Sequence, residues 1–189
     1  MLGSALALAS TVGLEGLTIG KLAEHVGMSK SGLFAHFSSK ENLQVAVLEE
    51  AIARFVGFVV TPALRQPRGE PRVRALFENW LAWTRAEFLP GGCIFVVAIV
   101  ELDDRPGPAR DRLIASQKDW FDTLAHAARI AVEEKHFRKD LDCQQLAHEV
   151  YSIAYGYHFL RSIIDPAEAE RRSRHAFERL IADARATRS

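Results

Sequence analysis

LTIGKLAEHVGMSKSGLFAHFSSK, residues 17–40, has the pattern of two short helices joined by a tight turn and followed by the start of a third. Gly27 can adopt the positive φ that ends a helix, and the small side chain of Ala23 lets a second helix approach closely. Apolar residues recur at helical spacing and would form the inward face of this unit: Leu22, Val26, Met28, Leu33 and Phe37. The stretch therefore predicts a helix-turn-helix.

The second helix of this pair, Lys30–His36, has the composition of a helix that reads DNA. Ser29 supplies a side-chain oxygen that can cap it. Its exposed residues are short or basic, so phosphates and base edges in a major groove can be approached without like-charge repulsion. From Met28 to Lys40 there are two lysines, one histidine and no acid. An ordinary helical hairpin also has glycine at its turn, but the ordered set of features favours DNA binding.

The longer run LTIGKLAEHVGMSKSGLFAHFSSKENL, residues 17–43, resembles the DNA-binding signature of the tetracycline-repressor (TetR) family. The shared features are a threonine opening the second helix, a glycine turn, a serine-led recognition helix, a His-Phe pair, and Ser-Lys-Glu opening the fourth helix. The resemblance covers about residues 4–50. It implies DNA contacts by Thr18, Ser29, Lys30, Ser31, Gly32, Phe34, His36 and Lys40. Phe34 and Gly32 depart from the tyrosine and threonine common there, and each departure removes one polar contact to DNA.

The resemblance also implies a function and partners. We expect a ligand-responsive transcriptional regulator, a repressor that a small apolar or aromatic effector releases from a palindromic, double-stranded DNA operator. By resemblance, the helices at about 143–164 and 167–186 pair with their symmetry mates in a homodimer; an internal core is the alternative role for them. The apolar faces of these two helices are broader than packing against a single neighbouring helix requires. They consist of Leu146, Val150, Ile153, Leu160, Ile164, Ala176, Phe177, Leu180, Ile181 and Ala184.

The net charge is low for a DNA-binding protein. The chain has 24 Lys and Arg against 24 Asp and Glu, and residues 1–60 hold four Lys or Arg against five Glu. Because affinity for DNA depends on neutralising phosphates, we expect weak binding by this sequence alone. Family members usually start with a basic arm ahead of the first helix, so we expect that upstream residues are missing here.

Composition limits the other classes of protein. The chain has 189 residues, 48% hydrophobic and 25% charged, as in a globular protein. It has no apolar run near the roughly 20 residues that span a bilayer, and no leader with a basic start. Two cysteines, Cys93 and Cys143, do not make a disulfide framework. We expect a cytoplasmic protein with no membrane partner.

Apolar periodicity interrupted by proline and glycine predicts an all-α fold of about nine helices. Ser38 or Ser39 would cap the fourth helix, and 61–71, TPALRQPRGEP, would be a loop. Outside the helix-turn-helix, helices are expected at 4–12, 40–60, 71–89, 93–102, 109–135, 143–164 and 167–186. We expect residues 1–45 to form a three-helix DNA-binding head, and residues 46–189 a larger helical domain for effector binding and dimerisation.

Aromatic residues are concentrated beyond the head, and most of them would simply pack in a core. Some have polar tips that a dry core must satisfy or that a ligand could use, such as Tyr151, Tyr155 and His158 on one helical face. We therefore expect an effector cavity. Its candidate lining residues are Trp80, Trp83, Phe95, Glu101, Trp120, Tyr151, Tyr155 and His158.

Two alternatives to a regulator remain open from the residues alone. A helical enzyme or ligand carrier could retain an accessory helix-turn-helix, although the sequence has no acid–base pair, cofactor loop or metal set. The Glu133-x-x-His136 spacing occurs once, and a di-iron bundle needs it twice. A DNA-bending protein without an effector would not need the aromatic residues. We therefore expect no enzyme activity, no catalytic residues, no metal and no cofactor.

Overall fold

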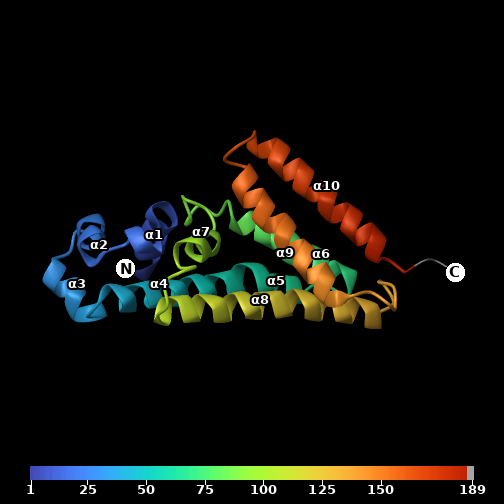
Figure 1. The fold of residues 1–189 in the computed structure, drawn as a ribbon, viewed down its shortest axis with the longest axis horizontal. Coiled ribbons are helices and arrows are strands. Elements are labelled where there is room, and N and C mark those ends of the chain that lie inside the picture. The colour runs from blue at the N-terminus through green and yellow to red at the C-terminus, as the bar shows by residue number, and fades with distance from the viewer. Residues whose placement is uncertain (187–189) are drawn as a thin grey trace. The chain divides into compact units, whose positions relative to one another are not determined.

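The computed structural model of the chain describes residues 1–186, whose regular elements are helices apart from one isolated antiparallel bridge between Phe137 and Arg185. The expected all-α fold is confirmed. The helices are α1 (Leu2–Gly16), α2 (Ile19–Val26), α3 (Lys30–Phe37), α4 (Lys40–Phe55), a π-helical turn η1 (Val56–Val60), α5 (Thr61–Leu64), α6 (Glu70–Trp83), α7 (Ile94–Glu101), α8 (Pro108–Glu133), α9 (Cys143–Leu160) and α10 (Pro166–Ala184) (Figure 1). Because α4, η1 and α5 are consecutive, the described residues form nine continuous helical segments.

The chain divides into two compact units. The first contains Met1–Val56 and Trp83–Gln117, and the second contains Gly57–Ala82 and the chain from Lys118 onward. Helices α1 to α4 and α7 therefore belong to the first unit, while α5, most of α6, α9 and α10 belong to the second. The residues of α8 are divided between the two.

The helix-turn-helix forms where its local signals predict it. Thr18 is the N-cap of α2, and its Oγ1 accepts a hydrogen bond from the backbone N–H of Lys21 at 3.2 Å. Gly27 ends α2 with φ 68°, a conformation that glycine adopts without strain. Ser29 caps α3, and its Oγ accepts from the N–H of Gly32 at 3.1 Å.

In this region the structure decides between the two predicted caps of the fourth helix, and it differs from the prediction for Met28. Ser39, and not Ser38, caps α4, since its Oγ accepts from the N–H of Asn42 at 3.0 Å. Ser38 instead ends α3 with φ 61°. Met28 was expected to face inward and is 41% exposed. It lies in the turn after Gly27, outside both helices, so the helical period does not apply to it.

Two helix ends also differ from expectation. α5 includes Pro62, which lies at its N1/N2 position directly after the π-helical turn η1. The loop predicted at 61–71 is thereby shortened, and α6 starts at Glu70. α6 ends at Trp83 and not at residue 89, because tight turns follow: the N–H of Ala86 donates to the Trp83 carbonyl, and that of Leu89 to the Ala86 carbonyl.

In the first unit, α1 packs against α4 and α7. Gly13 interrupts α1 with φ 76°, which exposes the N–H groups that follow it. The carboxylate of Glu101, the last residue of α7, accepts from the N–H of Leu14 at 2.7 Å and from that of Glu15 at 3.3 Å. The N–H of Gly91 donates to Ser10 Oγ at 3.0 Å. The C-terminal half of α1 is thus fixed to the segment around α7 by polar contacts.

The second unit is built on α9 and α10, which lie side by side (Figure 1). Phe177 of α10 stacks on Phe77 of α6 with ring centroids 3.9 Å apart. Glu70 accepts from both Arg185 and Arg74, at 2.7 and 2.6 Å, and these bonds, that from Arg185 first, hold the pKa of its carboxyl below the ordinary value. Ion pairs therefore join the start of α6 to the end of α10.

Candidate DNA-binding and effector-binding sites

Helix α3 is buried on one side and presents polar or aromatic side chains on the other. Leu33 and Phe37 are buried in the first unit. Gly32 and Thr18 are half-buried, and the other predicted contact residues of the turn and α3 are exposed: Ser29, Lys30, Ser31, Phe34 and His36. The structure thus places Lys30 to His36 on one short helix, capped by Ser29, whose outer side is exposed.

Lys40, at the start of α4, has a different environment from Lys30. Its ammonium lies 3.1 Å from a carboxylate oxygen of Glu15. Glu15 also accepts from Gln44 Nε2 at 3.0 Å and from Arg105 at 2.5 Å, and these partners, Gln44 first, lower the pKa of its carboxyl. Lys30 forms no ion pair among residues 1–186. The charge of Lys40 is therefore partly neutralised by Glu15, whereas no carboxylate of the described residues neutralises that of Lys30.

Three of the predicted effector residues of the second unit, Trp80, Tyr151 and Tyr155, form an aromatic cluster with Phe121 on α6, α8 and α9. The rings of Tyr151 and Tyr155 stack 4.4 Å apart, and their hydroxyl oxygens are 2.8 Å apart. Trp80 lies over Tyr155 at 6.5 Å, and Phe121 meets Tyr151 edge-on at 6.2 Å. Trp120, next to Phe121 on α8, is buried.

His158 is on α9, one turn beyond Tyr155. Its Nδ1 is buried and has no hydrogen-bond partner among the described residues. Burial first, and the nearby Arg161 second, lower its pKa to about 4, so the imidazole is neutral at pH 7. Because buried polar atoms in proteins are normally hydrogen-bonded, this nitrogen is a candidate contact for a ligand.

The other predicted effector residues lie in the first unit. Trp83 is fully buried, meets Phe55 edge-on at 5.3 Å and stacks near Phe95 at 6.3 Å. Glu101 contacts the backbone of α1, as described above. Five of the eight candidate residues thus lie in the second unit and three in the first.

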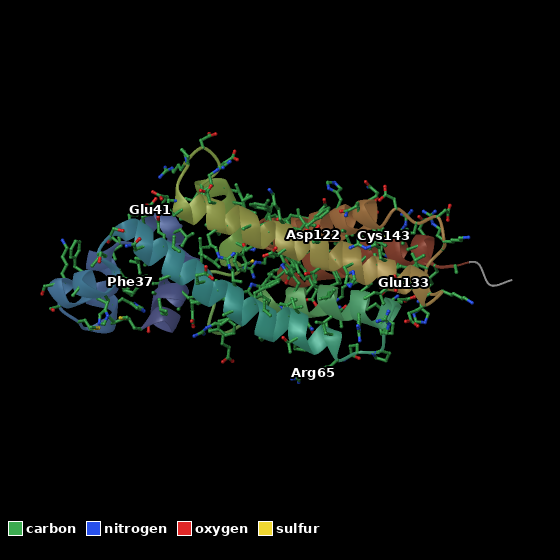
Figure 2. All side chains as sticks on the ribbon, turned by 90° about the horizontal axis from the view of Figure 1, so that it is seen from below. Phe37, Glu41, Arg65, Asp122, Glu133 and Cys143 are labelled. Carbon is green, nitrogen blue, oxygen red and sulfur yellow. The ribbon has the colours of Figure 1, made fainter. Side chains whose placement is uncertain are left out.

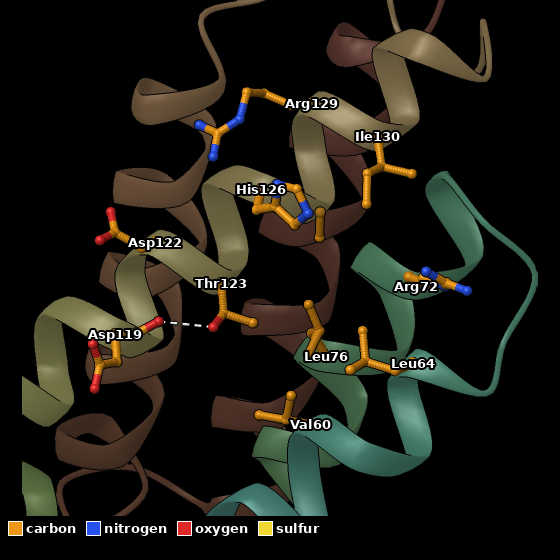
Figure 3. Close-up of a pocket in the computed structure, with 11 residues that line it drawn as sticks. Val60, Leu64, Arg72, Leu76, Asp119, Asp122, Thr123, His126, Arg129 and Ile130 are labelled. Carbon is orange, nitrogen blue, oxygen red and sulfur yellow. Dashed lines mark hydrogen bonds between the residues drawn. The ribbon is translucent and has the colours of Figure 1, made fainter.

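A groove in the second unit was not foreseen from the sequence. It has a volume of about 700 Å³ and lies between α8 and the segment from η1 to α6 (Figure 3). Its lining residues are Val60, Leu64, Arg72, Leu76, Asp119, Asp122, Thr123, His126, Ala127, Arg129 and Ile130. In the sequence, the polar residues of α8 have the pattern of a solvated face, and the groove forms only because η1, α5 and α6 also line it. The recurrence of Thr123, Ala127 and Ile130 at helical spacing was the available signal.

The outward side of α9 and α10 is partly apolar. Phe159, Leu160 and Ile163 are exposed at the C-terminal end of α9 and just beyond it. A shallow depression of about 430 Å³ runs between the two helices, lined by Glu149, Ser152, Ile153, Ala176, Arg179, Leu180 and Asp183. These are features of a surface that another chain can cover.

Other polar groups have structural partners. Glu133, at the end of α8 (Figure 2), pairs with Arg68 at 3.3 Å, and His136 Nδ1 accepts from the N–H of Glu70 at 3.1 Å. Residues 1–186 contain no group of three or more His, Cys, Asp or Glu able to hold a metal ion. Within the same range, no helix is long and apolar enough to cross a membrane.

Comparison with known proteins gives matches in both halves of the sequence. Residues 2–47 match the family described as "Bacterial regulatory proteins, tetR family", and residues 69–177 match "Tetracyclin repressor-like, C-terminal domain". The chain is 39% identical over 75 residues to the HTH-type transcriptional repressor AcnR of Corynebacterium diphtheriae. That match covers 40% of this chain and 39% of AcnR, well under half of the relative's length.

Solved structures share the fold over nearly the whole chain. A TetR transcriptional regulator from Chloroflexus aurantiacus superposes with a TM-score of 0.86 at 22% identity, over 98% of this chain and 94% of the other. AibR, solved in complex with isovaleryl coenzyme A and operator DNA, superposes with a TM-score of 0.68 at 23% identity, over 83% of each chain. At these identities the likeness concerns the fold.

Proposed function

Because the chain belongs to the TetR family of bacterial transcriptional regulators, we propose that it is a repressor that binds a palindromic operator and releases it when a small effector binds. The family consists of regulators and not of enzymes. In this proposal, residues 1–45 bind DNA, and residues 46–189 bind the effector and form the dimer. The name of AcnR, a transcriptional repressor, supports the sign of regulation.

The observation that carries the proposal is the capped, one-sided helix α3. Leu33 and Phe37 fix the helix to the first unit, and the Ser29 cap fixes its start. The side chains of Lys30, Ser31 and His36 project from it, in a stretch without acids. This is the arrangement by which a recognition helix enters a major groove, with phosphates contacted by the cation and base edges by the short residues.

DNA binding can be tested without knowing the operator. Duplexes retained by the protein from a random pool should converge on a near-palindrome, with half-sites about one helical turn apart or a small multiple of it. Lys30→Ala should bind the selected duplex more weakly, while Lys118→Ala, an exposed lysine of α8 in the second unit, should not. A pool that never converges would refute operator binding by this chain.

We further propose that the effector contacts five residues of the second unit: Trp80, Trp120, Tyr151, Tyr155 and His158. The stacked rings offer flat apolar surface, and the unpartnered His158 Nδ1 offers one hydrogen-bonding position. A small aromatic or apolar compound with a single polar group matches both features. AibR, whose structure contains both operator DNA and isovaleryl coenzyme A, supports the combination of the two partners in one protein of this fold.

Release requires that the effector and the DNA bind best to different conformations. The helical run from α4 through η1 to α5 is continuous along the chain from the first unit into the second. We propose that this run transmits the conformational change from the effector-binding domain to the DNA-binding head. By linkage, operator DNA must weaken effector binding by the same factor by which the effector weakens DNA binding, typically about 5 to 150-fold. Calorimetric titration of a candidate effector with and without the selected operator measures that factor. Equal affinities would exclude the coupling for that compound.

Palindromic recognition also needs two heads, and we propose a homodimer through α9 and α10. The exposed apolar residues at the end of α9 and the depression between the two helices support this choice of surface. A regulator that reads chromosomal DNA would act in the cytoplasm.

A further inference from the structure

We propose that Arg105, in the turn between α7 and α8, is a positioning residue for DNA binding, because its ion pair with Glu15 keeps the ammonium of Lys40 available for a DNA phosphate. The inference rests on the proposed function, in which the start of α4 meets the DNA backbone. Arg105 lies outside the helix-turn-helix and outside the proposed effector and dimer surfaces. The three residues belong to the first compact unit.

Glu15, near the end of α1, binds two cations through one oxygen atom. Its Oε2 lies 3.1 Å from Lys40 Nζ and 2.5 Å from Arg105 Nη1. Its Oε1 instead accepts from Gln44 Nε2 at 3.0 Å, and the same buried amide donates to the Leu14 carbonyl at 2.8 Å. The carboxylate is therefore held with Oε2 toward both cations, and the contact with Arg105 is the shorter of the two.

One carboxylate cannot neutralise two cations. The hydrogen bond from Gln44 first, and the two cations after it, hold the pKa of Glu15 below its ordinary value, so the group is ionised at neutral pH. A guanidinium is more weakly hydrated than an ammonium and pairs more readily with a carboxylate. The side chains of Arg105 and Lys40 are 60% and 41% exposed. Lys40, the less tightly bound cation, is thus the one that a phosphate can attract.

The turn that carries Arg105 is anchored on both sides. Before it, the carboxylate of Glu101 accepts from backbone N–H groups of α1. After it, Arg112 Nε of α8 donates to Glu49 Oε1 of α4 at 2.5 Å. These contacts place Arg105 beside Glu15 without help from the arginine itself, so substituting Arg105 changes the charge and leaves the turn in place.

An incidental surface ion pair is the competing interpretation, since exposed pairs stabilise a protein little. Arg105 follows two acids in the sequence, Asp103 and Asp104, yet neither forms an ion pair among residues 1–186. The arginine pairs instead with Glu15, which is 90 residues away, half-buried and fixed by a buried amide. Its side chain is therefore directed to the oxygen that Lys40 also uses, and not to the nearest acids.

The first test needs no DNA. Limited acetylation with acetic anhydride, followed by mass spectrometry, compares the labelling rate of Lys40 with that of Lys30, which has no ion pair among the described residues. In Arg105→Gln, Glu15 binds Lys40 alone and holds its proton more firmly. The labelling ratio of Lys40 to Lys30 should therefore fall about twofold, the effect of a stronger exposed ion pair. An unchanged ratio overturns the proposal.

The second test is titration of the selected duplex. Arg105→Gln should bind up to about fivefold more weakly at about 0.15 M salt, the contribution of one phosphate contact. Arg105→Lys, which retains a cation at this position, should bind like wild type. Arg110→Gln is the matched control, because Arg110 donates to the Asp103 carbonyl and pairs with no carboxylate of residues 1–186. It should also bind like wild type.

A double substitution separates positioning from direct contact. In Glu15→Gln the ammonium of Lys40 is free in any case, so adding Arg105→Gln should cost no further affinity. An equal loss in both backgrounds would show that Arg105 itself contacts DNA and would overturn the proposal. So would an Arg105→Gln protein, shown to be folded by its Tm, that binds like wild type. A wild-type chain that binds no duplex would refute the proposed function, and the labelling ratio would still decide whether Arg105 controls Lys40.

Discussion

His158 on α9 is a residue whose protonation opposes folding. Its pKa is lowered to about 4, mainly by burial, from an ordinary value of 6.5. Between these two pH values the unfolded chain binds a proton that the folded chain does not. The free energy of unfolding must therefore decrease as the pH falls through this window, and this contribution is complete above pH 6.5.

We expect the decrease in the free energy of unfolding at low pH to be smaller when the side chain at position 158 cannot titrate. His158→Phe keeps an aromatic ring at the position, so its Tm should decrease less than that of wild type between pH 6.5 and pH 4. Thermal unfolding of both proteins across this range measures the difference, with pH 8 as the reference at which neither carries the charge. The same decrease in both would show that His158 does not titrate as described.

Gly13 is a second residue whose identity is required by its surroundings. Its φ of 76° disfavours any side chain, and a Cβ would lie 1.8 Å from Glu101 Oε1. Gly13→Ala should lower the free energy of unfolding by about 1 to 3 kcal/mol, as measured by urea denaturation. Gly20→Ala in α2 is the control: the nearest atom to its Cβ is 3.9 Å away, so no loss is expected. A Gly13→Ala protein as stable as wild type would mean that Glu101 can move away at no cost.

At this scale the sequence predicted local chemistry well and burial less well. Thr18, Gly27 and Ser29 act within four residues of themselves, so their capping and turn roles could be inferred without a structure. The exposure of Met28 and the engagement of Glu101 with α1 could not. The exposure of Met28 and the contact of Glu101 both depend on how other segments of the chain pack around the side chain.

Among the elements, α3 and the start of α4 carry the charges expected to meet phosphate. Lys30→Ala should reduce the slope of log affinity against log salt by about one, since one phosphate contact is lost. Lys40→Ala should change the slope less, because Glu15 already compensates its ammonium at 3.1 Å. Titrations of the selected duplex at several salt concentrations give both slopes.

The partner of Lys40 provides the converse experiment. Glu15→Gln removes the compensating charge, and the slope should then become steeper than in wild type. An unchanged slope in both Lys40→Ala and Glu15→Gln would place Lys40 away from the DNA.

Helix existence was predictable, whereas helix ends were not always so. The apolar run around 93–102 was correctly predicted as a buried helix, α7, because no second strand was present to pair with it. Pro62 was interpreted as a helix breaker, but the helical run continues from η1 through it into α5. α6 ends at Trp83 because the segment after it forms tight turns, and apolar periodicity alone does not report that change.

For the whole molecule, the predicted dimer has a direct test. Leu180 lines the depression between α9 and α10, so Leu180→Glu would place a charge in the proposed interface. The dissociation constant of the dimer should rise by at least about 30-fold, the effect of an interface hot spot. Sedimentation velocity measures it, and binding to the palindrome should weaken in parallel.

Ala182→Glu is the matched control for that variant. Ala182 is exposed on the same helix and does not line the depression. A Leu180→Glu protein that remains dimeric would exclude this surface as the interface.

The arrangement of several elements was the part that the sequence did not predict. The eight expected effector residues are all aromatic or polar-tipped, yet they divide between two compact units. The groove on α8 was missed for the opposite reason, because its residues look like a solvated face until α5 and α6 are placed beside them. Selecting residues by type finds candidates, and only the fold shows which of them meet.

The position of the three tryptophans gives the protein built-in optical reporters. Trp80 and Trp83 are one turn apart on α6 but belong to different units, and Trp120 belongs with Trp80. Emission from a chain that retains only Trp83 would follow the first unit, where the ring is packed against Phe55. Emission from a chain that retains only Trp120 would follow the second. The order in which the two halves of the protein lose their packing can therefore be observed with its natural chromophores, without attaching a dye.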